Sequence, residues 1–137
     1  MRYLIDSDHV IDHLAELPIV TRLLDRLSQD GMAISMITYM EIYEGVLRAP
    51  DPSHARASLD RFLVGVPILP FSPEVARTCA SLRQRLRRER KRVNSRALDL
   101  LNAATAIHHG LIFVTRNIDD YSDIRDRNYS PSQCRAS

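Results

Sequence analysis

The segment Leu111-Ile112-Phe113-Val114 decides the fold class, because it is an unbroken apolar run that ends at a threonine. A run of this length without alternation predicts a strand that is buried on both faces. Tyr3-Leu4-Ile5 is a second run of the same kind and ends at Asp6. Further short strands are predicted at residues 32–35 and 67–70, where prolines flank the second and place it near a sheet edge.

Helical patterns fill the spaces between these strands. Capping residues, prolines and apolar spacing predict helices over residues 7–16, 18–30, 38–47, 53–64, from 73 into a basic stretch, and 98–109. Alternating short strands and helices predict an α/β fold, a three-layer α/β/α sandwich with a short, mostly parallel central sheet. We expect one domain spanning residues 1–137, with a flexible polar tail from about residue 126.

The composition excludes several classes of protein. The chain has 137 residues, 45% hydrophobic and 26% charged, as in ordinary globular domains, which excludes disordered and collagen-like proteins. Its apolar runs are shorter than the ~20 residues of a membrane span. Two cysteines are too few for a disulfide framework, and two early carboxylates interrupt any signal-peptide core. We therefore expect a cytoplasmic protein that does not enter a membrane.

The charge is unevenly distributed. The formal net charge is only +2, yet eight basic residues stand against a single acid between Arg83 and Arg96. The rest of the chain is therefore acidic. A basic stretch of this kind is typical of either a phosphate-binding surface for RNA or a solvated helix end that meets an acidic partner protein.

Acidic side chains gather at one predicted edge of the sheet. Asp6 ends the first strand, Glu41 lies early in the helix after the second, Asp99 opens the helix before the last strand, and Asp119-Asp120 follow that strand. The carboxyl ends of parallel strands and the amino ends of the connecting helices share an edge, so these acids are expected to converge. Converging carboxylates repel one another unless a cation offsets their charge, and Mg²⁺ prefers oxygen ligands. The pattern favours metal-assisted phosphoryl chemistry.

Four segments also resemble the ordered motifs of the PIN-domain nucleases, and among these the VapC-type toxins of bacterial toxin–antitoxin pairs. The resemblance spans nearly the whole chain and keeps the order and spacing of the motifs. They are Leu4-Ile5-Asp6-Ser7, the Ile37–Gly45 segment with Thr38 and Glu41, the Asp99–Gly110 segment, and the Val114–Tyr121 segment with Thr115, Arg116, Asn117 and Asp120.

The resemblance implies a metal-dependent endoribonuclease that takes Mg²⁺ or Mn²⁺, cleaves structured RNA such as tRNA or rRNA, and inhibits translation. It also implies a VapB-type antitoxin and a homodimer. The implied metal ligands are Asp6, Glu41, Asp99 and Asp120, supported by Ser7, Thr38, Thr115 and Asn117. The helices at residues 19–27 and 53–64 are candidate antitoxin grooves, with ordinary core packing of their apolar residues as the alternative. Candidate RNA contacts are Arg85, Arg88, Lys91, Arg92 and Arg116.

Three residues depart from the usual motifs and leave alternatives open. Asp8 stands at a position that is more often neutral, so it either adds a carboxylate to the site or caps the first helix. Asp119 competes with Asp120 for the role of fourth acid. Asn102 occupies a usually apolar position one turn after Asp99, where it contacts either the site or a partner.

Other functional patterns are less well supported. His9 and His13 have the spacing of a zinc pair, with Asp6 as a conceivable third ligand, but the glutamate base of zinc proteases is absent; we interpret them as solvated histidines. Cys79 is interpreted as a small buried packing residue rather than a nucleophile. The main alternative function is a catalytically silent module on the same fold that binds RNA or a partner protein.

Overall fold

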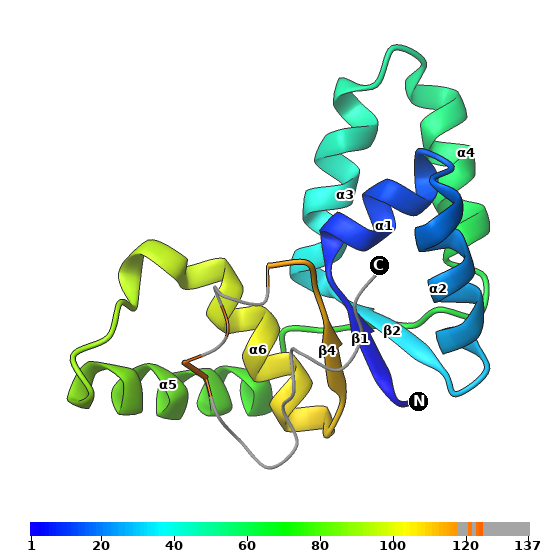
Figure 1. Ribbon diagram of the computed structural model, residues 1–137. Helices are drawn as coiled ribbons and strands as arrows, with labels where there is room; N and C mark the ends of the chain where they lie inside the picture. The colour runs from blue at the N-terminus through cyan, green and yellow to red at the C-terminus, as the bar shows by residue number, and fades with distance from the viewer. Residues whose placement is uncertain (118–120, 122, 125–137) are drawn as a thin grey trace.

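The computed structural model describes residues 1–117, 121, 123 and 124. Within them, four parallel strands form one sheet in the order β3-β2-β1-β4 (Figure 1). Their bounds are Tyr3–Ile5 (β1), Met32–Ser35 (β2), Ile68–Leu69 (β3) and Ile112–Val114 (β4). The predicted parallel α/β architecture is confirmed, including the edge position of the proline-flanked strand. The expected tail from residue 126 lies outside the described residues.

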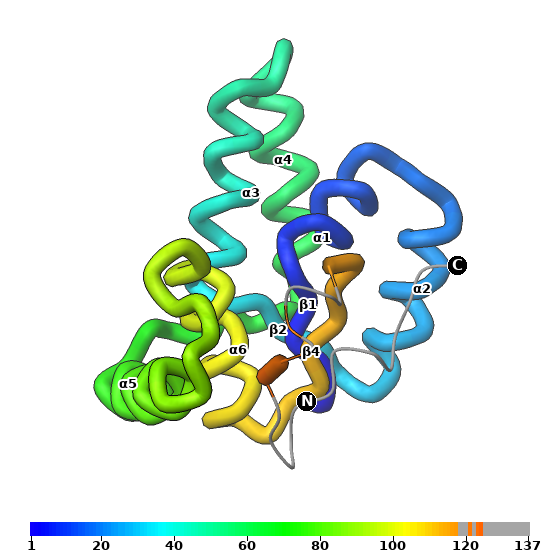
Figure 2. Tube along the Cα trace, turned by 60° about the vertical axis from the view of Figure 1, so that its left-hand side comes forward, coloured from blue at the N-terminus to red at the C-terminus, as the bar shows by residue number. Residues whose placement is uncertain are grey.

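Helices connect the strands and cover both faces of the sheet. In Figures 1 and 2, α5 and α6 lie on one side of β1 and β4, and α2 lies on the other. The helix bounds are Ser7–Leu14 (α1), Pro18–Ser28 (α2), Met36–Arg48 (α3), Pro52–Phe62 (α4), Pro73–Arg88 (α5) and Ala97–His109 (α6), with a 3₁₀ turn at Asn94–Arg96 (η1). No helix of the described part of the chain is long and apolar enough to cross a membrane.

Alternate strand residues point into two separate cores, which explains why the strands are continuously apolar. Leu4 and Phe113 pack against α5 and α6, together with Tyr121 and Ile124 from beyond β4. The other core is formed by alternate strand residues and side chains of α1 to α4, and includes Tyr3, Ile5, Ile34, Val114, Val10, Leu24, Ile42 and Leu59. Each core lies between the sheet and one of the two helical layers of the sandwich.

The boundaries of α1 and α3 differ from the predicted ones, and side-chain caps explain where both helices begin. Asp6, rather than Ser7 or Asp8, caps α1, and that helix ends at Leu14 instead of residue 16. Helix α3 begins two residues before the predicted Thr38 because the Ser35 side chain accepts a hydrogen bond from the Thr38 backbone N–H. A side-chain cap satisfies a backbone donor at a helix start and so fixes where the helix begins.

Candidate functional site

Asp6 is a buried carboxylate at the junction of β1 and α1, with only 6% of its surface exposed. Its Oδ1 accepts a hydrogen bond from the Ser7 backbone N–H at 2.8 Å, and its Oδ2 accepts one from the Thr115 hydroxyl at 2.8 Å. The Asp6 backbone N–H donates to the Val114 carbonyl at 2.9 Å. Asp6 is therefore fixed by the ends of two neighbouring strands.

The environment of Asp6 opposes ionisation. Its pKa is raised from 3.8 to about 7, mainly by burial and also by the charges of Asp8 and Glu41, against hydrogen bonds from Thr115 and Ser7 that lower it. An uncompensated carboxylate of this kind is costly to the fold and typical of a functional site.

Glu41 lies on α3 and is half-buried. Burial is the main cause of its raised pKa; the charges of Asp99, Glu44 and Asp8 act in the same direction, and a hydrogen bond with the Ser7 side chain opposes them. The carboxylates at the end of β1, on α3 and at the start of α6 therefore interact electrostatically. The structure brings Asp6, Glu41 and Asp99 to one region, with Ser7 between the first two.

Asp99 lies in the first turn of α6 and is half-buried. The Tyr121 hydroxyl donates a hydrogen bond to Asp99 Oδ1 at 3.0 Å. Tyr121 itself is 1% exposed, and its ring packs on Phe113 with centroids 4.8 Å apart. This contact was not predicted, because the sequence marks residue 121 only as the aromatic that follows Asp120.

A second contact missed by sequence reasoning joins α6 to the start of α3. The Ser35 hydroxyl donates to Asn102 Oδ1 at 2.5 Å, and both side chains are buried. Asn102 thus contacts the cap of α3, which carries Glu41. The only sequence signal was a polar residue in an otherwise apolar helix face. Thr38 is also buried, and its hydroxyl has no hydrogen-bond partner among the described residues.

The loop after β4 contacts α1 through Thr115 and Arg116. The Thr115 hydroxyl lies 3.5 Å from Asp8 Oδ2 and accepts a hydrogen bond from the Asn117 backbone N–H at 3.1 Å. The Arg116 backbone N–H donates to Asp8 Oδ2 at 3.1 Å. Asn117 is exposed. Asp8 therefore lies in the site region, and Asp6 rather than Asp8 is the N-cap of α1.

The other predicted RNA contacts lie apart from Arg116 in the chain, at the end of α5 and in the loop that follows. Arg88, Lys91 and Arg92 are exposed, whereas Arg85 is half-buried. Arg96, from the same basic stretch, is buried and forms a bidentate ion pair with Asp123, with Nη1–Oδ2 at 2.8 Å and Nη2–Oδ1 at 2.7 Å. Asp119 and Asp120 lie outside the described residues.

The histidines of α1 differ from their prediction as solvated residues. His9 is fully buried, and neither ring nitrogen has a hydrogen-bond partner within the described part of the chain. His13 is half-buried; its Nδ1 lies 3.1 Å from the Thr21 hydroxyl and its ring packs on Phe62. The prediction was wrong for His9 because α1 packs against α2, α3 and α4, and His9 lies among its buried residues. Burial lowers the pKa of His9, against the charge of Asp8, whose Oδ1 lies 3.5 Å from His9 Nδ1. Cys79 is buried as predicted.

The donor chemistry of the acids suits a hard divalent cation. Asp6, Glu41 and Asp99 offer oxygen atoms alone, which Mg²⁺ and Mn²⁺ accept as ligands. A cation would offset the repulsion that raises the pKa of Asp6 and Glu41. Across residues 1–117, 121, 123 and 124, however, no three histidine, cysteine, aspartate or glutamate side chains form a group that could hold one metal ion. Asp6, Glu41 and Asp99 therefore share one region without forming a complete coordination site among the described residues. His9, His13 and Asp6 do not form a zinc site there either.

Comparisons with known proteins agree with this architecture. The PIN domain family model matches residues 3–126. The chain is 27% identical over 126 residues to Ribonuclease VapC2 of Haemophilus influenzae, covering 90% of this chain and 92% of that relative. Its fold is similar to that of DNA-bound VapBC from Salmonella typhimurium, with a TM-score of 0.82 at 23% identity over 96% and 98% of the two chains. A toxin–antitoxin complex from Klebsiella pneumoniae matches with a TM-score of 0.71 at 26% identity over 93% and 95%.

Proposed function

Because the chain belongs to the PIN domain family, we propose that it is a divalent-metal-dependent endoribonuclease and the toxin of a VapBC-type pair. The observation that carries this proposal is the buried Asp6 carboxylate, whose pKa is raised to about 7 by burial and by neighbouring acids. A protein that only bound RNA or a partner would have no use for this costly arrangement. The alternative of a catalytically silent binding module is therefore disfavoured.

Asp6, Glu41 and Asp99 would hold Mg²⁺ or Mn²⁺, with Asp120 as the proposed fourth ligand. A divalent ion at such a site supplies a water of lowered pKa and neutralises phosphate charge. The neighbouring residues orient the acids. Thr115 fixes one oxygen of Asp6, Ser7 contacts Glu41, and Tyr121 fixes one oxygen of Asp99.

The proposed substrate is structured RNA, such as tRNA or rRNA, so that cleavage inhibits translation in the cytoplasm. The exposed basic residues Arg88, Lys91 and Arg92 support contact with a phosphate backbone, since they lie in the loop and helix end that lead towards α6 and Asp99. Lys and Arg side chains bind RNA phosphates with strong dependence on salt.

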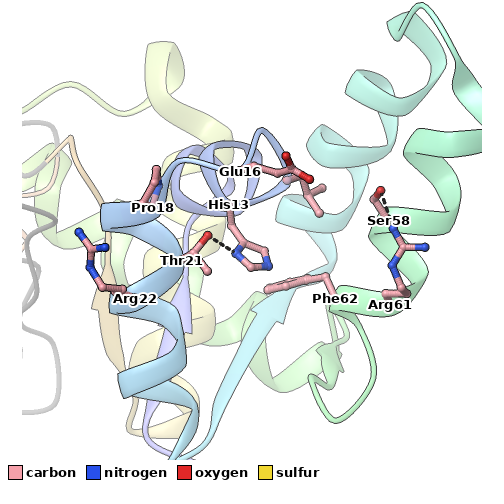
Figure 3. A pocket seen from close by; sticks show the side chains of 9 residues that line it. His13, Glu16, Pro18, Thr21, Arg22, Ser58, Arg61 and Phe62 are labelled. Carbon is pink, nitrogen blue, oxygen red and sulfur yellow. Dashed lines mark hydrogen bonds between the residues drawn. The ribbon is translucent and has the colours of Figure 1, made fainter.

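The proposed partners are a VapB-type antitoxin and a second copy of the chain. A cavity of about 520 Å³ opens between α1, α2 and α4, near the helices expected to receive an antitoxin. Figure 3 shows His13, Thr21 and Phe62 gathered at its centre and Arg61 to one side, whereas the Arg22 side chain points away from them. The lining combines the apolar side chains of Leu14, Pro18 and Phe62 with the charged groups of Glu16 and Arg61, which fits a partly apolar segment of a partner. The relatives named as VapBC complexes support the choice of antitoxin.

The proposed activity is tested by incubating the purified chain with tRNA or rRNA in Mg²⁺ and in EDTA. We expect cleavage only with the metal, and a fall in rate of at least about 10³-fold for Asp99→Asn, because a lost ligand removes several kcal/mol of transition-state stabilisation. Glu74→Gln is the matched control, since Glu74 lies in the first turn of α5 and is distant from these acids in the chain. Full cleavage in EDTA, or by Asp99→Asn, would refute the proposal; RNA binding without cleavage would favour the silent module.

Tyr121→Phe tests whether the Asp99 carboxylate must be oriented. The variant keeps the ring that packs on Phe113 and removes only the hydroxyl bonded to Asp99. We expect the cleavage rate to fall about 3- to 10-fold, as for the loss of one hydrogen bond of about 1 kcal/mol, and the affinity for Mn²⁺ measured by calorimetry to fall with it. Tyr43→Phe is the control, because that hydroxyl contacts Arg56 instead. Equal behaviour of the two variants would contradict the orienting role.

A further inference from the structure

Arg116 is held by two carboxylates on one face of α1. Its Nη1 lies 2.6 Å from Asp12 Oδ2, and its Nε lies 3.8 Å from Asp8 Oδ2. Asp8 and Asp12 are four residues apart on a helix, so their side chains project from the same face. The guanidinium group therefore bridges two successive turns of α1, next to the strand end that carries Thr115 and Asp6.

Asp8 differs from Asp6 in how its charge is balanced. Asp8 Oδ1 accepts the His9 backbone N–H at 2.6 Å, and Oδ2 accepts the Arg116 backbone N–H and pairs with the guanidinium group. Asp6 forms no ion pair with any described residue. The two acids thus have separate roles: Asp8 has its own cation, and Asp6 does not.

The guanidinium group retains capacity for another ligand. The Arg116 side chain is 53% exposed, and its described ion pairs involve Nε and Nη1. With 53% of the side chain exposed, part of the guanidinium group faces solvent. A guanidinium group carries five N–H donors in a planar fork that matches the oxygens of a phosphate. Because about half of the Arg116 side chain is exposed, an incoming phosphate can share its guanidinium group with Asp8 and Asp12 without displacing them.

We propose that Arg116 binds a backbone phosphate of the RNA beside the carboxylate site, and that Asp8 and Asp12 are positioning residues that hold its guanidinium group there. This inference rests on the proposed nuclease function. It assigns Asp8 to Arg116 rather than to the metal. Carboxylates repel an approaching polyanion, and the exposed part of the Arg116 guanidinium group offers a phosphate hydrogen-bond donors next to them.

The test compares Arg116→Ala, Arg116→Lys and Asp12→Asn with the control Arg48→Ala. Arg116→Ala removes the guanidinium group and keeps the backbone N–H that bonds Asp8, so the fold at this point is preserved. Arg48 is the matched control, being an exposed arginine in an i,i+4 ion pair with Glu44. We measure kcat and KM for cleavage of one RNA, its Kd, and the dependence of Kd on salt.

We expect Arg116→Ala to raise KM and Kd about tenfold, to leave kcat within about twofold, and to reduce the slope of log Kd against log salt by about 0.7 to 0.9. Arg116→Lys restores part of the affinity and the full slope. Asp12→Asn raises KM about threefold in the wild type and has no further effect when Arg116 is already alanine, because coupled residues are not additive.

The inference is overturned if Arg116→Ala behaves like Arg48→Ala, or if it lowers kcat while KM and Kd stay constant. If instead the chain is not a nuclease, the wild type does not cleave RNA in Mg²⁺ at all, and this outcome can be told apart from the two above. In that case the values of Kd and their salt slopes for the wild type and Arg116→Ala still decide whether Arg116 binds phosphate.

Discussion

Replacement of Asp6 by asparagine is expected to abolish RNA cleavage and, at pH 8 without metal, to raise the melting temperature. The native pKa of Asp6 is about 7, against an ordinary value of 3.8. Between about pH 4 and pH 7 the native state therefore binds a proton that the unfolded state has released, so the free energy of unfolding falls as the pH rises. Each pKa unit corresponds to about 1.4 kcal/mol, which gives an upper bound of ~4 kcal/mol at pH 8. Asparagine avoids this cost because it carries no charge.

The measurement is thermal unfolding followed by circular dichroism at pH 5 and pH 8 in EDTA, together with the cleavage assay. We expect Asp6→Asn to be several degrees more stable than the wild type at pH 8 and to lose most of that advantage at pH 5. Added Mg²⁺ should raise the melting temperature of the wild type and leave that of Asp6→Asn unchanged. Asp60→Asn, at an exposed acid of α4, should show neither effect. A less stable Asp6→Asn at pH 8 would contradict the argument.

The second large effect is expected at Arg96, where methionine should lower the free energy of unfolding by about 2 to 4 kcal/mol. Only 6% of the Arg96 side chain is exposed, and it bonds both oxygens of Asp123, at 2.8 and 2.7 Å. Removing one partner of a buried pair leaves the other charge uncompensated. Because Tyr121 lies two residues before Asp123, the variant should also lower the rate of cleavage through Asp99.

Urea unfolding at pH 7 measures this loss, with Arg77→Met as the control. Arg77 is 72% exposed and 3.7 Å from Glu74, so its replacement should change the free energy of unfolding by less than about 0.5 kcal/mol. Arg96 also lowers the pKa of Asp123. The stability from this pair is therefore present above about pH 4 and is lost as the pH falls through the lowered pKa. If Arg96→Met unfolds at the same urea concentration as Arg77→Met, the pair has no structural role.

The sequence predicts the parts of this molecule that depend on local pattern. Apolar runs predict the strands, flanking prolines predict the edge position of β3, and the placement of acids at strand and helix ends predicts that Glu41 lies within electrostatic range of Asp6 and of Asp99. These features follow from periodicity and from the geometry of parallel sheets. The role of Asp120 stays a prediction, because it lies outside the described residues.

What the sequence does not predict depends on contacts between distant segments. The burial of His9 results from three helices that cover α1. The partners of Ser35 and Tyr121 are 67 and 22 residues away in the chain, at Asn102 and Asp99. A polar residue in an apolar position indicates that some contact exists, but it does not identify the partner. Tertiary packing decides which side chains lie opposite one another.

The hydrogen bond between Ser35 and Asn102 joins two layers that have separate cores. Glu41 lies on α3 on one side of the sheet and Asp99 on α6 on the other, whereas Asp6 lies at the end of the central strand β1. A small slip of one layer against the other would therefore separate the acids while both cores stayed packed. On gentle heating, RNA cleavage should therefore be lost at a lower temperature than the helical circular dichroism signal.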